Sequence, residues 1–172
     1  MDFQKFVDEK NLAATNNNID WGKRKAEWLS KLEELYSTIN NFLNPYTRTG
    51  KITINAEVKN LSEQWIGEYQ AKALLITIGR EQVRLDPIGT LVIGAKGRVD
   101  VIGSSGTTRL VLVEKDQEGL RTNLTKQLEK SKKTKSTEID YVWRISSPPP
   151  RITFFPLEEQ SFFDVLMKVS NA

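Results

Sequence analysis

The stretch that decides the fold is AKALLITIGREQVRL, residues 71–85. Its first eight residues form a nearly continuous apolar run, and near its end Val83 and Leu85 alternate with polar side chains, a period of two that is typical of strands. Between them, Gly79 stands at the first central position of a two-residue turn, where a type II′ turn needs a positive φ angle. The stretch therefore predicts a tight hairpin.

The same period of two extends on both sides of this hairpin, from residue 51 to residue 115. Ile52 and Ile54 alternate with polar residues before it, and residues 91–93 resume a strand pattern after it. Residues 98–102 and 107–115 then predict a second hairpin around the small, turn-forming sequence GSSG. Because short turns join neighbouring strands antiparallel, the region predicts a mainly antiparallel sheet.

Helical periodicity flanks the predicted sheet on both sides. Asp20 can cap a helix over residues 20–44 that ends at Pro45. The apolar side chains of this helix recur at steps near three, four or seven: Trp21, Trp28, Leu32, Leu35, Ile39 and Phe42. Later segments predict a helix over 119–133, strands over 140–145 and 151–155, and a final helix after Pro156.

This order of elements predicts an α+β fold: a mostly antiparallel, curved sheet of six or seven strands packed against a long N-terminal helix and a C-terminal helix. The length suits a single domain, residues 1–172, in which residues 1–18 dock loosely. No basic stretch leading into an apolar run opens the chain, and the longest apolar run is far shorter than a membrane span of ~20 residues. We therefore expect a soluble cytoplasmic protein.

The chain contains neither cysteine nor histidine, and these two absences exclude whole mechanisms. Without cysteine there are no disulfides, thiolate nucleophiles or iron–sulfur clusters. Without histidine there is no Ser-His-Asp triad, no His-ligated zinc or haem, and no imidazole base near neutral pH. Any chemistry must use carboxylates, Lys, Tyr, Ser or Thr, together with a hard cation such as Mg²⁺.

One segment concentrates the positive charge of the chain. Residues 119–135 hold six basic side chains against Glu129, a net charge of +5, so the rest of the +3 chain carries −2. The six are Arg121, Lys126, Lys130, Lys132, Lys133 and Lys135. They can neutralise an anionic partner such as a nucleic acid or an anionic lipid surface. The alternative is a solvated helix end whose lysines complement the helix dipole.

A second group of residues, Asp100 with Glu114, Lys115 and Asp116, points to catalysis. Here the chain resembles the core of PD-(D/E)xK nucleases, which carries an acidic residue on its second strand and an acid-x-Lys motif on its third. The resemblance implies that paired carboxylates hold Mg²⁺ and that the lysine helps to activate water. The sequence departs from that motif, because Val113 stands two residues before Lys115 and Asp116 stands two residues after Glu114.

The register of the second hairpin decides whether these carboxylates can meet. A tight turn at 103–106 sets Asp100 opposite Arg109 as a cross-strand ion pair. It places Glu114 five residues further along, roughly 16 Å away and too far to share a metal. A wider loop over 104–109 sets Asp100 opposite Glu114 instead. The small, turn-forming GSSG sequence favours the tight version.

By elimination, we expect a non-catalytic binding or regulatory module, such as an adaptor, an inhibitor or an accessory subunit, that binds a protein partner and needs no cofactor. The alternative is a divalent-metal nuclease or phosphodiesterase with Asp100, Glu114, Lys115 and Asp116 as catalytic residues, or an inactive relative that binds nucleic acid. Mg²⁺ is the expected cofactor under this alternative alone.

Overall fold

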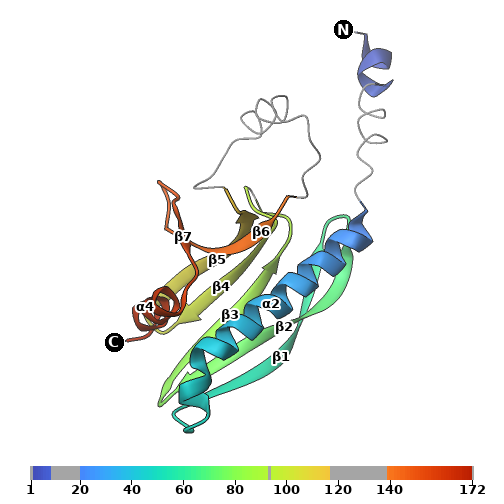
Figure 1. Ribbon diagram of the computed structural model, residues 1–172. Helices are drawn as coiled ribbons and strands as arrows, with labels where there is room; N and C mark the ends of the chain where they lie inside the picture. The colour runs from blue at the N-terminus through green and yellow to red at the C-terminus, as the bar shows by residue number, and fades with distance from the viewer. Residues whose placement is uncertain (1, 9–19, 93, 117–138, 172) are drawn as a thin grey trace.

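The computed structural model describes residues 2–8, 20–92, 94–116 and 139–171. Seven strands form one antiparallel sheet that is not closed into a barrel, with a long helix before it and a shorter one after it (Figure 1). The elements are α2 (Trp21–Thr47), β1 (Ile52–Glu63), β2 (Gly67–Ile78), β3 (Glu81–Gly89), β4 (Gly97–Gly103), β5 (Gly106–Glu114), β6 (Tyr141–Ser146), β7 (Phe154–Pro156) and α4 (Glu159–Val169). The predicted α+β class is confirmed. The helix predicted over 119–133 lies outside the described residues.

The sheet is a meander in which each strand pairs with the next one along the chain. In the β2–β3 hairpin, Ile78 lies opposite Glu81, and Gly79 has a φ angle of 60°, as the type II′ turn requires. In the β4–β5 hairpin, Gly103 lies opposite Gly106. Both hairpin predictions are confirmed, the second in its tight register.

Several strand predictions differ from the structure, and one of them is the last strand, which covers Phe154–Pro156 rather than 151–155. β1 and β2 are twelve residues each, longer than their apolar alternation indicates, and β2 pairs with β3 only from Leu74 onward. The rest of the β1–β2 hairpin, before Leu74 in β2, has no pairing with β3. Val58 in this part is 68% exposed, so the sequence there does not alternate cleanly between apolar and polar residues. The strand predicted over 91–93 is wrong for its described residues, because only a single bridge joins Val92 to Ala95.

Helix α2 begins directly after its predicted cap and ends later than predicted. The Asp20 carboxylate accepts the backbone N–H of Lys23 at 3.0 Å, which satisfies one donor of the first turn. The predicted end at Pro45 is wrong, because the helix continues to Thr47. Proline removes one backbone hydrogen bond, and packing offsets that loss: the ring of Tyr46 meets Phe163 of α4 edge-on, with centroids 5.9 Å apart.

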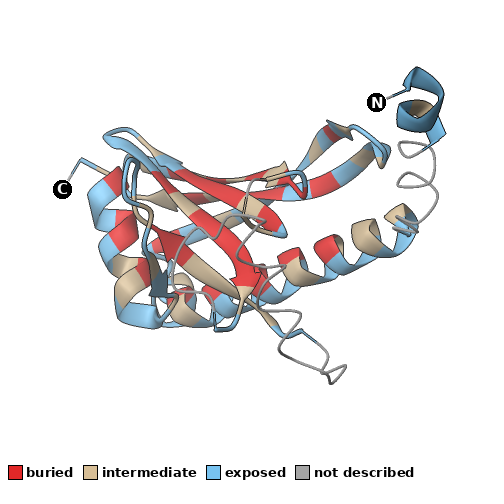
Figure 2. Ribbon diagram, turned by 90° about the horizontal axis from the view of Figure 1, so that it is seen from above, coloured by how far each residue is buried: buried red, intermediate tan, exposed pale blue. Residues whose placement is uncertain are grey.

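The core lies between α2, α4 and one face of the sheet, and Figure 2 shows the curved sheet with the two helices on the same side. The buried residues of α2 are Trp28, Leu32, Leu35, Tyr36, Ile39 and Leu43. Tyr36 and Leu43 were not among the predicted core residues, while Phe42 is half-buried against Phe162 of α4. No helix in the described part of the chain is long and apolar enough to cross a membrane.

Two glycines let the helices approach the sheet closely. A Cβ atom on Gly97 of β4 would overlap the six-membered ring of Trp28, which is 2% exposed. A Cβ atom on Gly103, at the other end of β4, would overlap the backbone carbonyl of Val169 in α4. Each glycine is therefore required by a close approach to a helix rather than by the conformation of its own backbone.

One carboxylate ties the extended β1–β2 hairpin to the segment after β3. Glu63 accepts hydrogen bonds from the Tyr69 hydroxyl (2.5 Å), the Thr90 amide and hydroxyl (2.6 and 2.9 Å) and the Leu91 amide (3.0 Å). Burial alone would raise the pKa of Glu63, but these hydrogen bonds outweigh burial and hold the pKa below its ordinary value. The ionised carboxylate is thus the form that the fold favours.

Replacing Glu63 by glutamine should lower the free energy of unfolding by about 1–3 kcal/mol at pH 7, because at least two donors lose a charged acceptor. Since the folded-state pKa lies below the unfolded value, the stabilisation by Glu63 is present above the unfolded pKa and is lost as the pH falls through the folded pKa. Urea unfolding at a series of pH values should therefore show that the difference in unfolding free energy between the original protein and Glu63→Gln shrinks as the pH falls. Glu68→Gln, an exposed change on the same hairpin, is the control and should have little effect at either pH.

Candidate anion-binding site

A notch opens in the sheet where β6 ends. Arg109 of β5 lies opposite Ser146, the last residue of β6, whereas β5 itself starts three residues earlier, at Gly106. The notch holds a cavity of about 170 Å³. Its lining residues come from β4, β5, the segment after β6 and α4: Arg98, Thr107, Thr108, Arg109, Ser146, Ser147, Pro148, Pro149 and Lys168. We call this cavity the β5 notch. Its lining contains three basic side chains and no carboxylate.

Arg98 is held in place by Asp100, two residues further along the same face of β4. The two side chains form a bidentate pair, with Nε and Nη2 donating to the carboxylate at 2.6 and 2.7 Å. This pairing raises the pKa of Arg98, so the guanidinium stays charged. Asp100 is 8% exposed, and its contacts use two of the three guanidinium nitrogens. The third nitrogen, Nη1, forms no hydrogen bond with any described residue.

Arg109 and Lys168 bring charge to the notch without a partner of their own. Arg109 lies directly opposite Asp100 in the register, as the tight hairpin predicts. The predicted ion pair between them is wrong, however, because the Asp100 carboxylate is already occupied by the two-point contact with Arg98. Neither Arg109 nor Lys168 forms an ion pair or a side-chain hydrogen bond with any described residue. Both cations are therefore available to an anion.

Thr108 and Ser147 also line the notch. Thr108 is 7% exposed, and its Oγ1 atom is buried with no hydrogen-bond partner in the described part of the chain. Because side chains alternate along a strand, Thr108, opposite the core residue Val101, faces the other side of β5 from Arg109, so its hydroxyl is not counted as a ligand-binding group. The segment after β6 is held in place by hydrogen bonds of Ser147. Its Oγ donates to the Arg151 carbonyl at 2.9 Å and accepts the Thr153 amide at 2.7 Å.

The size and chemistry of the β5 notch suit a small tetrahedral oxyanion. A phosphate or sulfate group offers three or more acceptor oxygens, and guanidinium and ammonium groups bind such oxygens through short, charge-assisted hydrogen bonds. The notch supplies Arg109 and Lys168 as unpaired cations and Arg98 as an oriented one.

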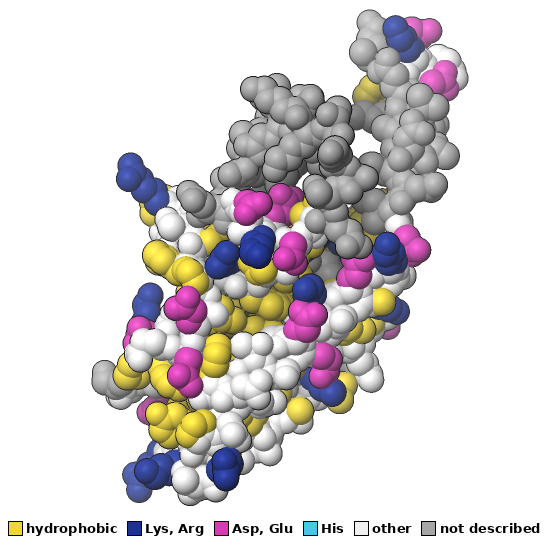
Figure 3. Space-filling view, viewed as in Figure 1, with side chains coloured by type: hydrophobic (Ala, Val, Ile, Leu, Met, Phe, Trp, Pro, Cys, Tyr) yellow, Lys and Arg dark blue, Asp and Glu magenta, His cyan; other side chains and the backbone are white. Residues whose placement is uncertain are grey.

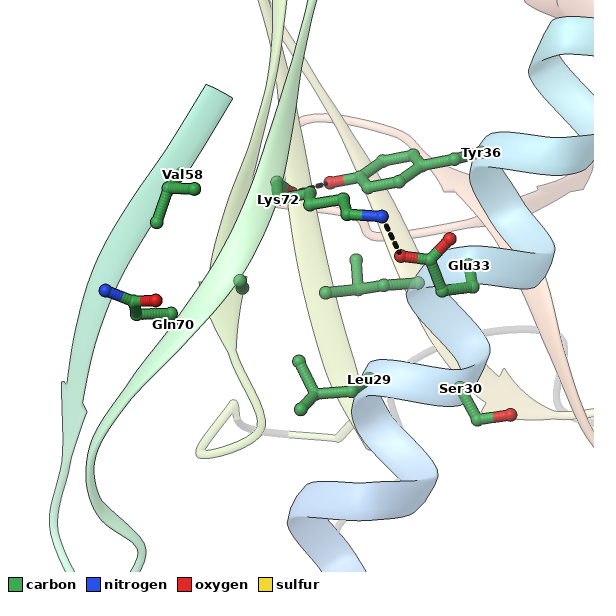
Figure 4. A pocket seen from close by; sticks show the side chains of 9 residues that line it. Leu29, Ser30, Glu33, Tyr36, Val58, Gln70 and Lys72 are labelled. Carbon is green, nitrogen blue, oxygen red and sulfur yellow. Dashed lines mark hydrogen bonds and ion pairs between the residues drawn. The ribbon is translucent and has the colours of Figure 1, made fainter. Parts of the chain in front are cut away.

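A larger hollow lies elsewhere, between α2 and the extended β1–β2 hairpin, with a volume of about 430 Å³. Figure 4 shows Val58 and Gln70 on its strand side and Tyr36 and Glu33 on its helix side. Here the polar groups satisfy one another: Lys72 pairs with Glu33 at 3.2 Å, and the Tyr36 hydroxyl donates to the Lys72 carbonyl. Because these groups are already paired, they give no indication of a ligand.

The structure separates the residues that suggested a nuclease. Asp100 lies on β4 opposite Arg109, while Glu114 ends β5, opposite Tyr141, five residues beyond Arg109 and so roughly 16 Å away along the strand. Lys115 and Asp116 are exposed in the turn that follows β5. Among the described residues, no three acidic side chains form a group that could hold a metal ion. The nuclease hypothesis stays a prediction, which a cleavage assay with Mg²⁺ and labelled DNA or RNA tests.

Asp86 is a charged residue that sequence reasoning missed. It lies opposite Asp100 on the neighbouring strand, where Lys59 at 2.9 Å and Arg84 at 3.3 Å neutralise its carboxylate. The alternation of Arg84 and Asp86 with apolar residues indicates their common face, but only the β3–β4 register shows that Asp86 is the neighbour of Asp100. The six basic residues predicted to bind anions, Arg121, Lys126, Lys130, Lys132, Lys133 and Lys135, lie outside the described residues.

Comparison of the chain with protein-family models, with curated proteins and with solved structures finds no match. The assignment of the site therefore depends on its own geometry.

Proposed function

We propose that this protein is a non-catalytic binding module that recognises a phosphate group on a partner protein through the β5 notch. The observation that carries the proposal is the presence of two unpaired cations, Arg109 and Lys168, beside the oriented Arg98 in a cavity without a lining carboxylate. An adaptor or accessory subunit in the cytoplasm, as expected from the sequence, would use such a site to bind a modified partner.

Electrostatics and rigidity support a binding function. The cations come from two elements, β5 and α4, and α4 is held at the β4–β5 turn, where the backbone N–H of Ser105 donates to the Val169 carbonyl at 2.8 Å. Arg98 cannot swing away from the notch without breaking its two-point contact with Asp100. A site whose donors are already oriented loses little conformational entropy when the ligand binds. Such preorganisation is typical of recognition sites for phosphate.

Isothermal titration calorimetry with blocked phosphoserine, blocked serine and inorganic phosphate tests the proposal at constant ionic strength. Phosphoserine should bind saturably and unmodified serine should not. Arg109→Ala should weaken phosphoserine binding about tenfold or more, because one charge-assisted hydrogen-bonding group is lost. Lys168→Ala should weaken it less, because an exposed ammonium contributes mainly as a point charge.

Two exposed cations far from the notch provide matched controls. Arg80→Ala, in the β2–β3 turn, and Lys51→Ala, before β1, should leave the affinity unchanged. Equal weakening by Arg80→Ala and Arg109→Ala would show only a general charge effect and would reject the site. Binding of inorganic phosphate without binding of phosphoserine would reject the partner protein as the source of the phosphate.

A further inference from the structure

A second cavity lies at the opposite end of β5, between the first turns of α2 and strand β6, with a volume of about 520 Å³. Arg24 and Trp28 line its helix side, and Lys96, Leu112, Ile139 and Tyr141 line its sheet side. Sites for small organic ligands have volumes of roughly 300–1,000 Å³ and combine apolar walls with a few polar groups. We call it the α2–β6 cavity. It shares no lining residue with the β5 notch.

Arg24 is a charged group that the cavity leaves partly unsatisfied, and Trp28 Nε1 is a second buried donor there without a partner among the described residues. Its Nη2 atom donates to the Thr90 carbonyl at 3.0 Å, and its guanidinium carbon lies 5.4 Å from the ring centroid of Trp21. Its Nε atom, in contrast, is buried and has no hydrogen-bond partner among the described residues. A buried N–H of a charged group without an acceptor is costly, so this donor indicates a missing oxygen atom.

The guanidinium is oriented before any ligand binds. Thr90, whose carbonyl holds Arg24, is fully buried, and its amide and hydroxyl both donate to Glu63. Glu63 in turn accepts the hydroxyl of Tyr69. Arg24 therefore rests on a relay of hydrogen bonds that begins in the β1–β2 hairpin, and its free Nε cannot turn to water without breaking the bond to Thr90.

The remaining walls are flat and mostly apolar. Trp28 is held between Gly97 and the ring of Trp143, whose centroid lies 6.0 Å away. The ring of Tyr141 lies beneath the ammonium group of Lys96, 5.3 Å from its centroid. Ile139, at the rim, is 48% exposed. These walls favour a planar, apolar ligand body, because aromatic faces stack on flat groups.

The charges around the cavity limit the size of an anionic ligand. Two further cations, Lys23 and Lys31, and two carboxylates, Glu27 and Asp140, also line the cavity. Lys23 faces Glu27 at 3.9 Å, Lys31 pairs with Glu34 at 3.0 Å, and Asp140 is exposed at the rim. Figure 3 shows acidic and basic side chains interspersed on this face of the molecule, among hydrophobic ones. Such a surface does not attract a polyanion, whereas a single negative charge can reach Arg24 inside the cavity.

We propose that the α2–β6 cavity binds a small molecule that carries one carboxylate on a planar aromatic body, with the carboxylate on Arg24 and the ring against Leu112, Ile139 and Tyr141. The inference does not depend on the proposed phosphate recognition, because the two sites use different residues.

Calorimetric titration with 2-naphthoate tests this site, with 2-naphthamide as the neutral analogue of the same shape. The naphthoate should bind saturably and about tenfold or more tightly than the amide, since only the carboxylate offers a charged acceptor to Arg24. Arg24→Leu should remove this preference. Arg24→Lys keeps the charge but loses the planar fork, and should retain part of the preference. Arg48→Leu, at the exposed other end of α2, is the control and should change nothing.

Two further measurements distinguish naphthoate binding in the α2–β6 cavity from binding in the β5 notch and from a folding defect. Arg109→Ala should leave naphthoate binding unchanged, which distinguishes the cavity from the β5 notch. Thermal unfolding shows whether Arg24→Leu still folds. If it does not, the acid-over-amide preference measured in Arg24→Lys tests the inference instead. Absence of naphthoate binding, equal binding of acid and amide, or full preference in both Arg24 variants would overturn the inference.

Discussion

Replacing Gly97 by alanine is expected to lower the free energy of unfolding by about 2–3 kcal/mol. The added methyl group would overlap the Trp28 ring, which is almost completely buried and is packed against Trp143. Neither ring has free space to move into, so the helix must shift away from the sheet or a side chain must leave its preferred rotamer. Urea unfolding monitored by tryptophan fluorescence measures the loss directly.

The same substitution elsewhere provides a control of opposite sign. Gly22 lies in the first turn of α2, where an added Cβ atom makes only an ordinary contact. Gly22→Ala should stabilise the protein by up to about 1 kcal/mol, because alanine favours helix more than glycine does. Combining Gly97→Ala with Trp28→Phe should cost less than the two single changes together, since the smaller ring makes room. Strict additivity would contradict the close approach of Trp28 to Gly97.

Replacing Asp100 by alanine is expected to lower the free energy of unfolding by about 2–3 kcal/mol, because it leaves the half-buried guanidinium of Arg98 without its two-point partner. Phosphoserine binding should also weaken, since Arg98 loses its orientation toward the β5 notch. A carboxylate that serves catalysis behaves differently, because its removal commonly leaves stability unchanged or raises it. The sign of the stability change therefore distinguishes a positioning residue from a metal ligand.

Two further variants serve as controls for the Asp100→Ala experiment. Asp116→Ala removes a candidate acid that is exposed in the turn after β5, and it should change stability by less than about 0.5 kcal/mol. A double-mutant cycle between Asp100→Ala and Arg98→Ala isolates the pairwise energy in urea unfolding. No coupling between them, or a gain in stability on losing Asp100, would contradict the role assigned here.

The parts of the fold that local signals determine were predictable from sequence. Gly79 in a two-residue turn between apolar strands predicts the β2–β3 hairpin, and Asp20 before an apolar helical repeat predicts the start of α2. The length of the β1–β2 hairpin was not predictable, because residues such as Val58 are exposed where the hairpin leaves the sheet. The end of α2 was missed because the tertiary contact of Tyr46 with Phe163 outweighs the local effect of Pro45.

The candidate site was only partly predictable, for a reason of geometry. The register that places Arg109 opposite Asp100 follows from the turn sequence, but the choice of Arg98 as the partner of Asp100 depends on side-chain positions. Ser147 and Lys168 come from segments far along the chain that meet β5 only in the folded protein. No local pattern predicts that juxtaposition, because it depends on where β6 ends and where α4 docks.

The central claim, that the β5 notch recognises a phosphate group, is tested most directly by titrating blocked phosphoserine into ¹⁵N-labelled protein and following each backbone amide. The claim predicts saturable shifts at Thr107, Thr108, Arg109 and Ser147, with one dissociation constant, and their loss in Arg109→Ala. Shifts that do not saturate at constant ionic strength, or that saturate only at residues outside the notch, would contradict it.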